Sequence, residues 1–161
     1  MKIRTDFVTN SSSSSFIVAY KDSDEMVADI SQYVKNYEDD EWSHQYRDVI
    51  YDIFKNKASY EDVLAAYSDF LDSEAYIALV TNSQYANNRA KYSNHQEWVK
   101  SEEFKKLKKE FIKNKLNEFK ETVNPDFYFA ILNYSDSDGY YDVESNLHKM
   151  LNGLCIRLSR H

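Results

Sequence analysis

The sequence predicts an α+β fold, with a small mixed or antiparallel sheet formed from both chain ends and covered by several helices from the middle of the chain. Apolar runs of strand length occur near the two ends, whereas apolar residues in the middle recur at helical spacing. The length of 161 residues suits one domain. We therefore predict a single domain over 1–161, with an N-terminal hairpin at 1–20, a helical middle at 21–124 and a strand–helix–strand segment at 126–161.

The N-terminal hairpin is predicted from two apolar segments that flank a run of hydroxyl side chains. Residues 2–8 and 15–20 carry the apolar side chains, and Asn10 is followed by five consecutive serines. Serine and asparagine form turns through bonds between side chain and backbone. The serines are therefore expected at the tip of the hairpin.

The helical middle begins after Asp22-Ser23-Asp24-Glu25, where acids and a capping hydroxyl suit a helix N-terminus. A first helix runs to about Tyr37. A second starts near Ser43, and its predicted inner face consists of Tyr46, Val49, Ile50, Ile53 and Phe54.

A third helix is predicted to open at Ser59, because Asp62 stands three residues later as in a capping box. Residues 75–80 are apolar at nearly every position, which fits either a buried helix or a short strand. After a polar loop or frayed helix, one long helix is expected from Ser93 or Asn94 to about Val123, ended by Pro125.

The C-terminal segment is predicted to be a strand, a turn, a helix and a strand. Residues 127–134 are apolar on both faces, which is typical of an interior strand. A turn follows at 135–139, then a short helix at 143–151 and a last strand at 154–159.

Charge is distributed unevenly along this chain of net charge −7. Residues 21–74 hold fifteen acidic and five basic side chains, whereas residues 89–120 hold ten basic and five acidic ones. Two interpretations stay open: solvated helical faces that attract each other, or an acidic surface that meets a basic partner. The negative net charge of the whole chain and the five acids within residues 89–120 argue against direct binding of nucleic acid.

Localisation is predicted to be cytoplasmic. The single cysteine, Cys155, has no partner for an internal disulfide, which suits a reducing compartment. No signal core and no apolar run of about 18 residues occurs in the sequence, so no membrane span is expected.

The two ends together resemble a group of small proteins from bacteria and their mobile elements. The opening Met1-Lys-Ile-Arg-Thr-Asp-Phe-Val-Thr-Asn-Ser-Ser-Ser-Ser-Ser-Phe-Ile17 is similar to theirs, as are Tyr134-Ser-Asp-Ser-Asp-Gly139, Glu144 and Ile156-Arg-Leu-Ser-Arg-His161. The resemblance covers about the first 20 and the last 35 residues. It implies that the ends form one unit and that the protein derives from a phage or mobile element; it implies no activity.

A candidate ligand site follows if the ends share a sheet. Its residues are polar or charged and come from both ends: Arg4, Asp6, Asn10, Ser11, Ser12, Ser13, Asp136, Asp138, Glu144 and His161. Acids with a histidine suit a divalent metal, and serines with an arginine suit a phosphate. No EF-hand spacing and no G-x-S-x-G elbow accompanies them. No cofactor is predicted, with a divalent metal as the alternative.

Two functions are compatible with this sequence. The first is a non-catalytic binding or inhibitor protein, whose acidic, tyrosine-bearing helical surface imitates nucleic-acid charge and engages a basic protein partner. Its contact residues are the acidic run Glu38, Asp39, Asp40 and Glu41. The alternative is a nucleotide or phosphate binder, or a metal-assisted hydrolase, that uses the serine-rich turn with the acids of the C-terminal end.

Overall fold

The computed structural model describes residues 13–36, 43–135, 147, 149–151 and 154–158. The chain divides into two compact units, one formed by residues 1–63 with 124–161 and the other by residues 64–123. We call them the sheet unit and the helical unit. Among the described residues, no helix has both the length and the hydropathy that a membrane crossing requires. The single domain over 1–161 stays a prediction.

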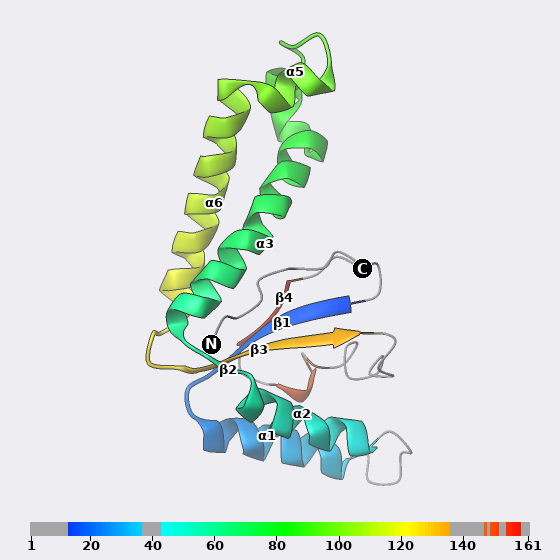
Figure 1. Ribbon diagram of the computed structural model, residues 1–161, viewed down its shortest axis with the longest axis vertical. Coiled ribbons are helices and arrows are strands. Elements are labelled where there is room, and N and C mark those ends of the chain that lie inside the picture. Colours follow the sequence, from blue (N-terminus) through cyan, green and yellow to red (C-terminus); the bar gives the residue numbers. More distant parts are fainter. Residues whose placement is uncertain (1–12, 37–42, 136–146, 148, 152–153, 159–161) are drawn as a thin grey trace. The chain divides into compact units, whose positions relative to one another are not determined.

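The sheet unit is built on four antiparallel strands, three from the two ends of the chain and a short one from its predicted helical middle (Figure 1). Their order is β2 (Lys57–Ala58), β3 (Tyr128–Ser135), β1 (Ser13–Tyr20) and β4 (Leu154–Arg157). The predicted α+β class is confirmed, and of the two sheet types the antiparallel one is present. The interior position predicted for the strand at 127–134 is also confirmed, because β3 pairs with β2 on one side and β1 on the other.

The predicted N-terminal hairpin is wrong where the structure tests it. Over Phe16–Ala19, β1 pairs with β3 on one edge and with β4 on the other. Since a strand has only two hydrogen-bonding edges, no edge is left there for residues 2–8, which lie outside the described residues. Ser13, Ser14 and Ser15 are strand residues of β1 and not part of a turn, because β3 supplies their backbone partners.

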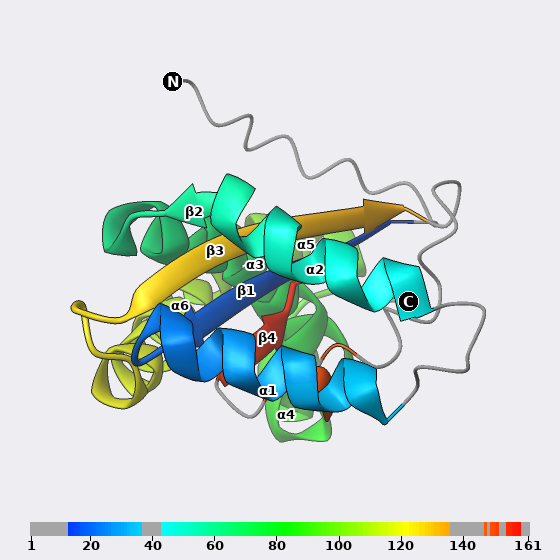
Figure 2. The ribbon, with the colours of Figure 1, turned by 90° about the horizontal axis from the view of Figure 1, so that it is seen from below.

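One face of the sheet is covered by two helices, α1 (Ser23–Lys35) and α2 (Ser43–Lys55) (Figure 2). The strands contribute alternate residues to this core, as the two-residue period of a strand requires. The helices contribute residues at four-residue spacing. The buried members from these four elements are Phe16, Val18, Tyr20, Ala130, Leu132, Tyr134, Met26, Ile30, Val34, Val49 and Ile53.

The segment around residue 150 completes this core. Leu147, Met150 and Leu151 are almost fully buried in it. Leu147 and Met150 are helical, and the backbone N–H of Leu151 donates to the carbonyl of Leu147. The helix predicted at 143–151 is therefore present at residues 147, 149 and 150, and Leu151 lies just beyond it.

Helix starts follow the predicted caps with one change. The helix α3 (Tyr60–Thr81) opens with the capping box: Ser59 Oγ accepts from the Asp62 N–H, and Asp62 Oδ2 accepts from the Ser59 N–H, each at 3.1 Å. At α1 the cap is the carboxylate of Asp22, which accepts from the Glu25 N–H at 2.8 Å, and not a serine hydroxyl. Residues 75–80, left open between helix and strand, belong to α3.

In the helical unit, α3 and α6 (Glu102–Thr122) pack side by side and antiparallel (Figure 1). The ring of Tyr67 lies 4.6 Å from that of Phe119, and the ring of Tyr76 lies 6.0 Å from that of Phe104. Between the helices run the 3₁₀ turn η1 (Ser83–Tyr85) and the short helices α4 (Ala86–Arg89) and α5 (His95–Lys100).

The single long helix predicted to end near Val123 is wrong at Ser101, where the chain breaks into α5 and α6. Ser101 has extended backbone, with ψ at 152°, so the helical ladder cannot pass through it. Its hydroxyl accepts from the Phe104 N–H and thereby caps α6, while Asn94 caps α5. The residues Ser101-Glu102-Glu103 carried this helix-start signal in the sequence.

Candidate functional site

The sequence-predicted ligand site lies almost entirely outside the described residues. This holds for Arg4, Asp6, Asn10, Ser11, Ser12, Asp136, Asp138, Glu144 and His161. Ser13 is described as the first residue of β1, and its backbone partner is Ser135, the last residue of β3. The Leu158 N–H donates to the Ser15 carbonyl at 2.6 Å at the same end of the sheet. The strands that carry the two chain ends thus meet there, while the clustering of the polar side chains stays a prediction.

Ser15 is the one serine of the run whose side chain the structure describes. Its hydroxyl donates to Oδ1 of Asn133 at 2.6 Å, and the two residues are direct partners across β1 and β3. This cross-strand bond satisfies the hydroxyl within the sheet. Among the described parts of the chain, no group of three His, Cys, Asp or Glu side chains has the arrangement of a metal site.

The acidic run Glu38, Asp39, Asp40 and Glu41 also lies outside the described residues. Several other acids of residues 21–74 have structural partners. Asp29 Oδ2 accepts from the Tyr20 hydroxyl at 3.2 Å, and Asp52 Oδ2 accepts from the Tyr134 hydroxyl at 3.4 Å. Desolvation by burial raises the pKa of Asp52, and the bond from Tyr134 partly offsets it. Asp29 and Asp52 therefore form hydrogen bonds within the folded protein.

The most exposed large apolar side chains that the structure describes are Tyr51, at 67%, and Phe54, at 47%. Both belong to α2, on the side away from the buried Val49 and Ile53. The prediction placed Phe54 on the inner face, which is wrong. Five of the six residues 49–54 are apolar, and a helix that turns about 100° per residue cannot bury all of them on one face. From this crowding of apolar residues, the sequence could have predicted that some of them are exposed.

Basic side chains and a third aromatic ring surround this pair. Lys55 Nζ lies 5.9 Å from the ring centre of Tyr51, and Lys57 Nζ lies 5.2 Å from that of Tyr128. The rings of Phe54 and Tyr128 meet edge to face at 5.9 Å. Exposed Arg47 stands one turn before Tyr51 on α2. We call this surface the α2 patch; its members are Arg47, Tyr51, Phe54, Lys55, Lys57 and Tyr128.

The electrostatics of the α2 patch favour contact over proton chemistry. Desolvation raises the pKa of Tyr128, so its hydroxyl stays protonated at neutral pH. Lysines over aromatic rings form cation–π contacts, which contribute about 0.5–1 kcal/mol at exposed sites such as these. The patch thus presents aromatic rings with basic side chains beside them, and the acids Asp48 and Asp52 belong to the same helix.

Two further side chains that could act as nucleophile or base, Cys155 and His95, have structural surroundings among the described residues. Burial raises the pKa of the Cys155 thiol to about 12, which keeps it protonated. The Nε2 of His95 lies 3.0 Å from the hydroxyl of Tyr76 in the helical unit.

Comparisons with protein-family models, with curated proteins and with solved structures found no match to this chain.

Proposed function

We propose that this protein is a non-catalytic binding protein that engages a protein partner through the α2 patch. The carrying observation is the exposure of Tyr51 and Phe54 beside each other on one helix. Protein–protein interfaces are enriched in Tyr, Phe and Arg at their centres. A partner with an apolar depression rimmed by acids has the complementary chemistry.

The packing of the α2 patch supports this proposal. Neither Tyr51 nor Phe54 is needed to fill the core, because Val49 and Ile53 of the same helix do so. The contact between Phe54 and Tyr128 restricts both rings before any partner arrives. Rings held in advance lose less side-chain entropy on binding, which favours affinity.

The acidic run stands between α1 and α2 in the sequence, so we include it as a second contact in this proposal. Charge reversal at Glu38, Asp39, Asp40 and Glu41 should weaken partner capture, and the loss should depend on salt. Unchanged capture by the charge-reversed protein would remove the acidic run from the interface.

The test compares two variants of neighbouring residues. The double variant Tyr51→Ser, Phe54→Ser alters the patch and should abolish capture of partners from an extract of the native host, read by quantitative mass spectrometry. Ile53→Ala is the matched folding control. It removes a buried side chain, so it should cost about 2–5 kcal/mol of stability while capture well below its melting temperature persists. Equal capture by the double variant and the wild type would overturn the proposal.

Single-stranded nucleic acid is the other partner that exposed rings with basic neighbours can bind. A labelled oligothymidylate tests it by fluorescence anisotropy. The net charge of −7 opposes this partner, so we expect no binding at physiological salt. If the oligonucleotide binds the wild type but not the Tyr51→Ser, Phe54→Ser variant, the partner of the α2 patch is nucleic acid and not a protein.

The alternative function, a phosphate or nucleotide binder at the chain ends, rests on the meeting of Ser13, Ser135 and Leu158 at one end of the sheet. It predicts a thermal shift with a nucleotide or a divalent metal that Asp138→Ala or Glu144→Ala removes. No shift with any nucleotide, phosphate or metal would eliminate this function.

A further inference from the structure

The lysines of α6 fall into two groups. Three of them form ion pairs: Lys105 with Glu102, Lys108 with Asp72 and Lys115 with Glu118. The other four form no ion pair or hydrogen bond with any residue that the structure describes, namely Lys106, Lys109, Lys113 and Lys120. The positive charges of this second group are therefore not neutralised by ion pairs with residues that the structure describes.

These four lysines lie on one face of α6. Their spacings of three, four and seven residues return to the same side of a helix. Lys109 and Lys120 are separated by about 16 Å along the helix axis, or three turns. The four lysines thus form a basic row along one face of α6 in the helical unit.

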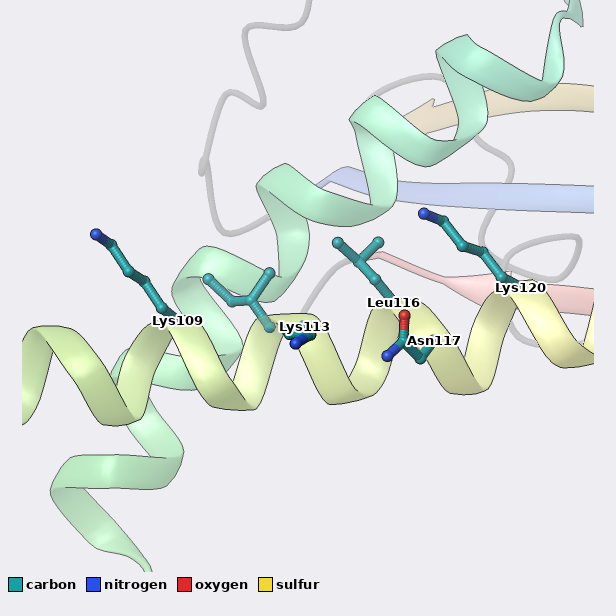
Figure 3. Close-up of a pocket in the computed structure, with 6 residues that line it drawn as sticks. Lys109, Lys113, Leu116, Asn117 and Lys120 are labelled. Carbon is teal, nitrogen blue, oxygen red and sulfur yellow. The ribbon is translucent and has the colours of Figure 1, made fainter.

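Apolar surface accompanies the row. Ile112 and Leu116 are half-buried and one turn apart, and they line a shallow hollow of about 280 Å³ with Lys109, Lys113, Asn117 and Lys120. In Figure 3, Lys109, Leu116 and Lys120 project from the same side of α6, and Lys113 and Asn117 stand next to them. We call these six residues the α6 strip.

The shape of the α6 strip selects among anionic partners. Small-molecule sites are concave, about 300–1,000 Å³, and enclose most of their ligand. Here one helix supplies every lining residue of a smaller hollow, which suits an elongated partner lying along α6. The strip has no aromatic ring on which a base can stack, and it has only two half-buried apolar side chains to enter a lipid surface.

We propose that the α6 strip docks an acidic amphipathic helix of a protein partner. Leucine-like side chains of that helix would contact Ile112 and Leu116, and its carboxylates would pair with Lys109, Lys113 and Lys120. Helix-in-groove recognition reads apolar anchors at one-turn spacing, and charge pairs along the edges set orientation and specificity. This surface is independent of the α2 patch, which belongs to the other unit and has aromatic anchors.

The test uses the full chain and three labelled probes, read by fluorescence anisotropy and vesicle co-sedimentation. The first is a synthetic helical peptide with leucines on one face and glutamates beside them, together with its scrambled isomer. The second is a duplex DNA oligonucleotide, and the third is a vesicle of phosphatidylserine and phosphatidylcholine. The amphipathic peptide should bind at least tenfold more tightly than its isomer, and high salt should weaken it.

Two triple variants with the same change in charge separate the α6 strip from net charge. Lys109→Glu, Lys113→Glu, Lys120→Glu should reduce peptide affinity at least tenfold, whereas Lys21→Glu, Lys35→Glu, Lys100→Glu should leave it within about twofold of the wild type. Leu116→Ser should reduce affinity without changing net charge. The Tyr51→Ser, Phe54→Ser variant should bind the peptide normally, so that failure here is distinct from failure at the α2 patch.

Four outcomes would overturn the proposal. One is equal affinity for the peptide and its scrambled isomer, which would show that the α6 strip binds acidic peptides through charge alone. A second is tighter binding of DNA or vesicles, and a third is binding of no probe. The fourth is self-association that only the α6 triple variant loses, which would make a second copy of this chain the occupant.

Discussion

The ammonium nitrogen of Lys108 lies 2.7 Å from a carboxylate oxygen of Asp72 and joins α6 to α3. This pair is a direct contact between the acidic and the basic stretches of the sequence. It confirms, at one point, the interpretation that the two charged stretches attract each other. Four other lysines of α6 form no such pair with a described residue. Ion pairs within the protein therefore involve only part of the positive charge of α6.

The Lys108–Asp72 pair should contribute little to stability, because the Asp72 side chain is 62% exposed. We expect a coupling of about 0.5 kcal/mol in a double-mutant cycle with Asp72→Ala and Lys108→Ala, measured by urea unfolding at low salt. The coupling should shrink at high salt. A coupling above about 2 kcal/mol, or one that salt leaves unchanged, would mean that the pair is desolvated.

The capping box of α3 should contribute measurably to the stability of the protein, although its hydrogen bonds are exposed. Ser59→Ala leaves the Asp62 N–H without its acceptor, so we expect a loss of about 1 kcal/mol in the free energy of unfolding. Ser73→Ala is the matched control, because Ser73 is exposed within the same helix. Alanine is the better helix former there, so a small gain is expected. Similar values for the two variants would argue against the cap.

Acid should weaken the connection between α4 and α6. Glu103 accepts from Lys91, Asn88 and the Tyr92 hydroxyl, at 2.9, 2.8 and 3.0 Å. These hydrogen bonds, with that from Lys91 the largest contribution, lower the pKa of Glu103 to about 2 from an ordinary value of 4.5. A carboxyl whose pKa is lowered on folding stabilises the fold above its unfolded pKa, and this contribution disappears as pH falls from 4.5 toward 2.

Glu103→Gln isolates that contribution. The variant should melt at a lower temperature than the wild type at pH 7, and the difference should narrow as the pH falls below 4.5. Melting curves followed by circular dichroism at several pH values measure it. A difference that stays constant with pH would show that the charge of Glu103 contributes nothing and that only its shape matters.

Cys155 should be unreactive in the folded protein. With a pKa of about 12 against an ordinary 9.0, its thiolate fraction at pH 8 is reduced by a factor of about 10³. Labelling with a thiol-specific disulfide reagent should therefore be slow in buffer and fast in denaturant. Equal rates in both would mean that β4 opens on the timescale of labelling, since Cys155 is paired with Val18 in the sheet.

Local patterns in the sequence were sufficient to predict the types of most elements. The four-residue spacing of Met26, Ile30 and Val34 and the box of Ser59 with Asp62 act within one or two helical turns. Proline at 125 ends a helical ladder whatever surrounds it. The meeting of both chain ends in one sheet also followed, because apolar strand runs occur mainly there.

Only the tertiary structure decided which neighbours these elements have. The serines at 13–15 carry no strand signal of their own, and they become strand because β3, more than a hundred residues away, supplies their hydrogen-bond partners. The strand β2 has two residues and exists only through its pairing with β3. Phe54 is exposed because Val49 and Ile53 already fill the space above the sheet. Both proposed surfaces depend on such non-local burial: periodicity shows that a helix has an apolar face, but only packing determines which apolar side chains are left for a partner.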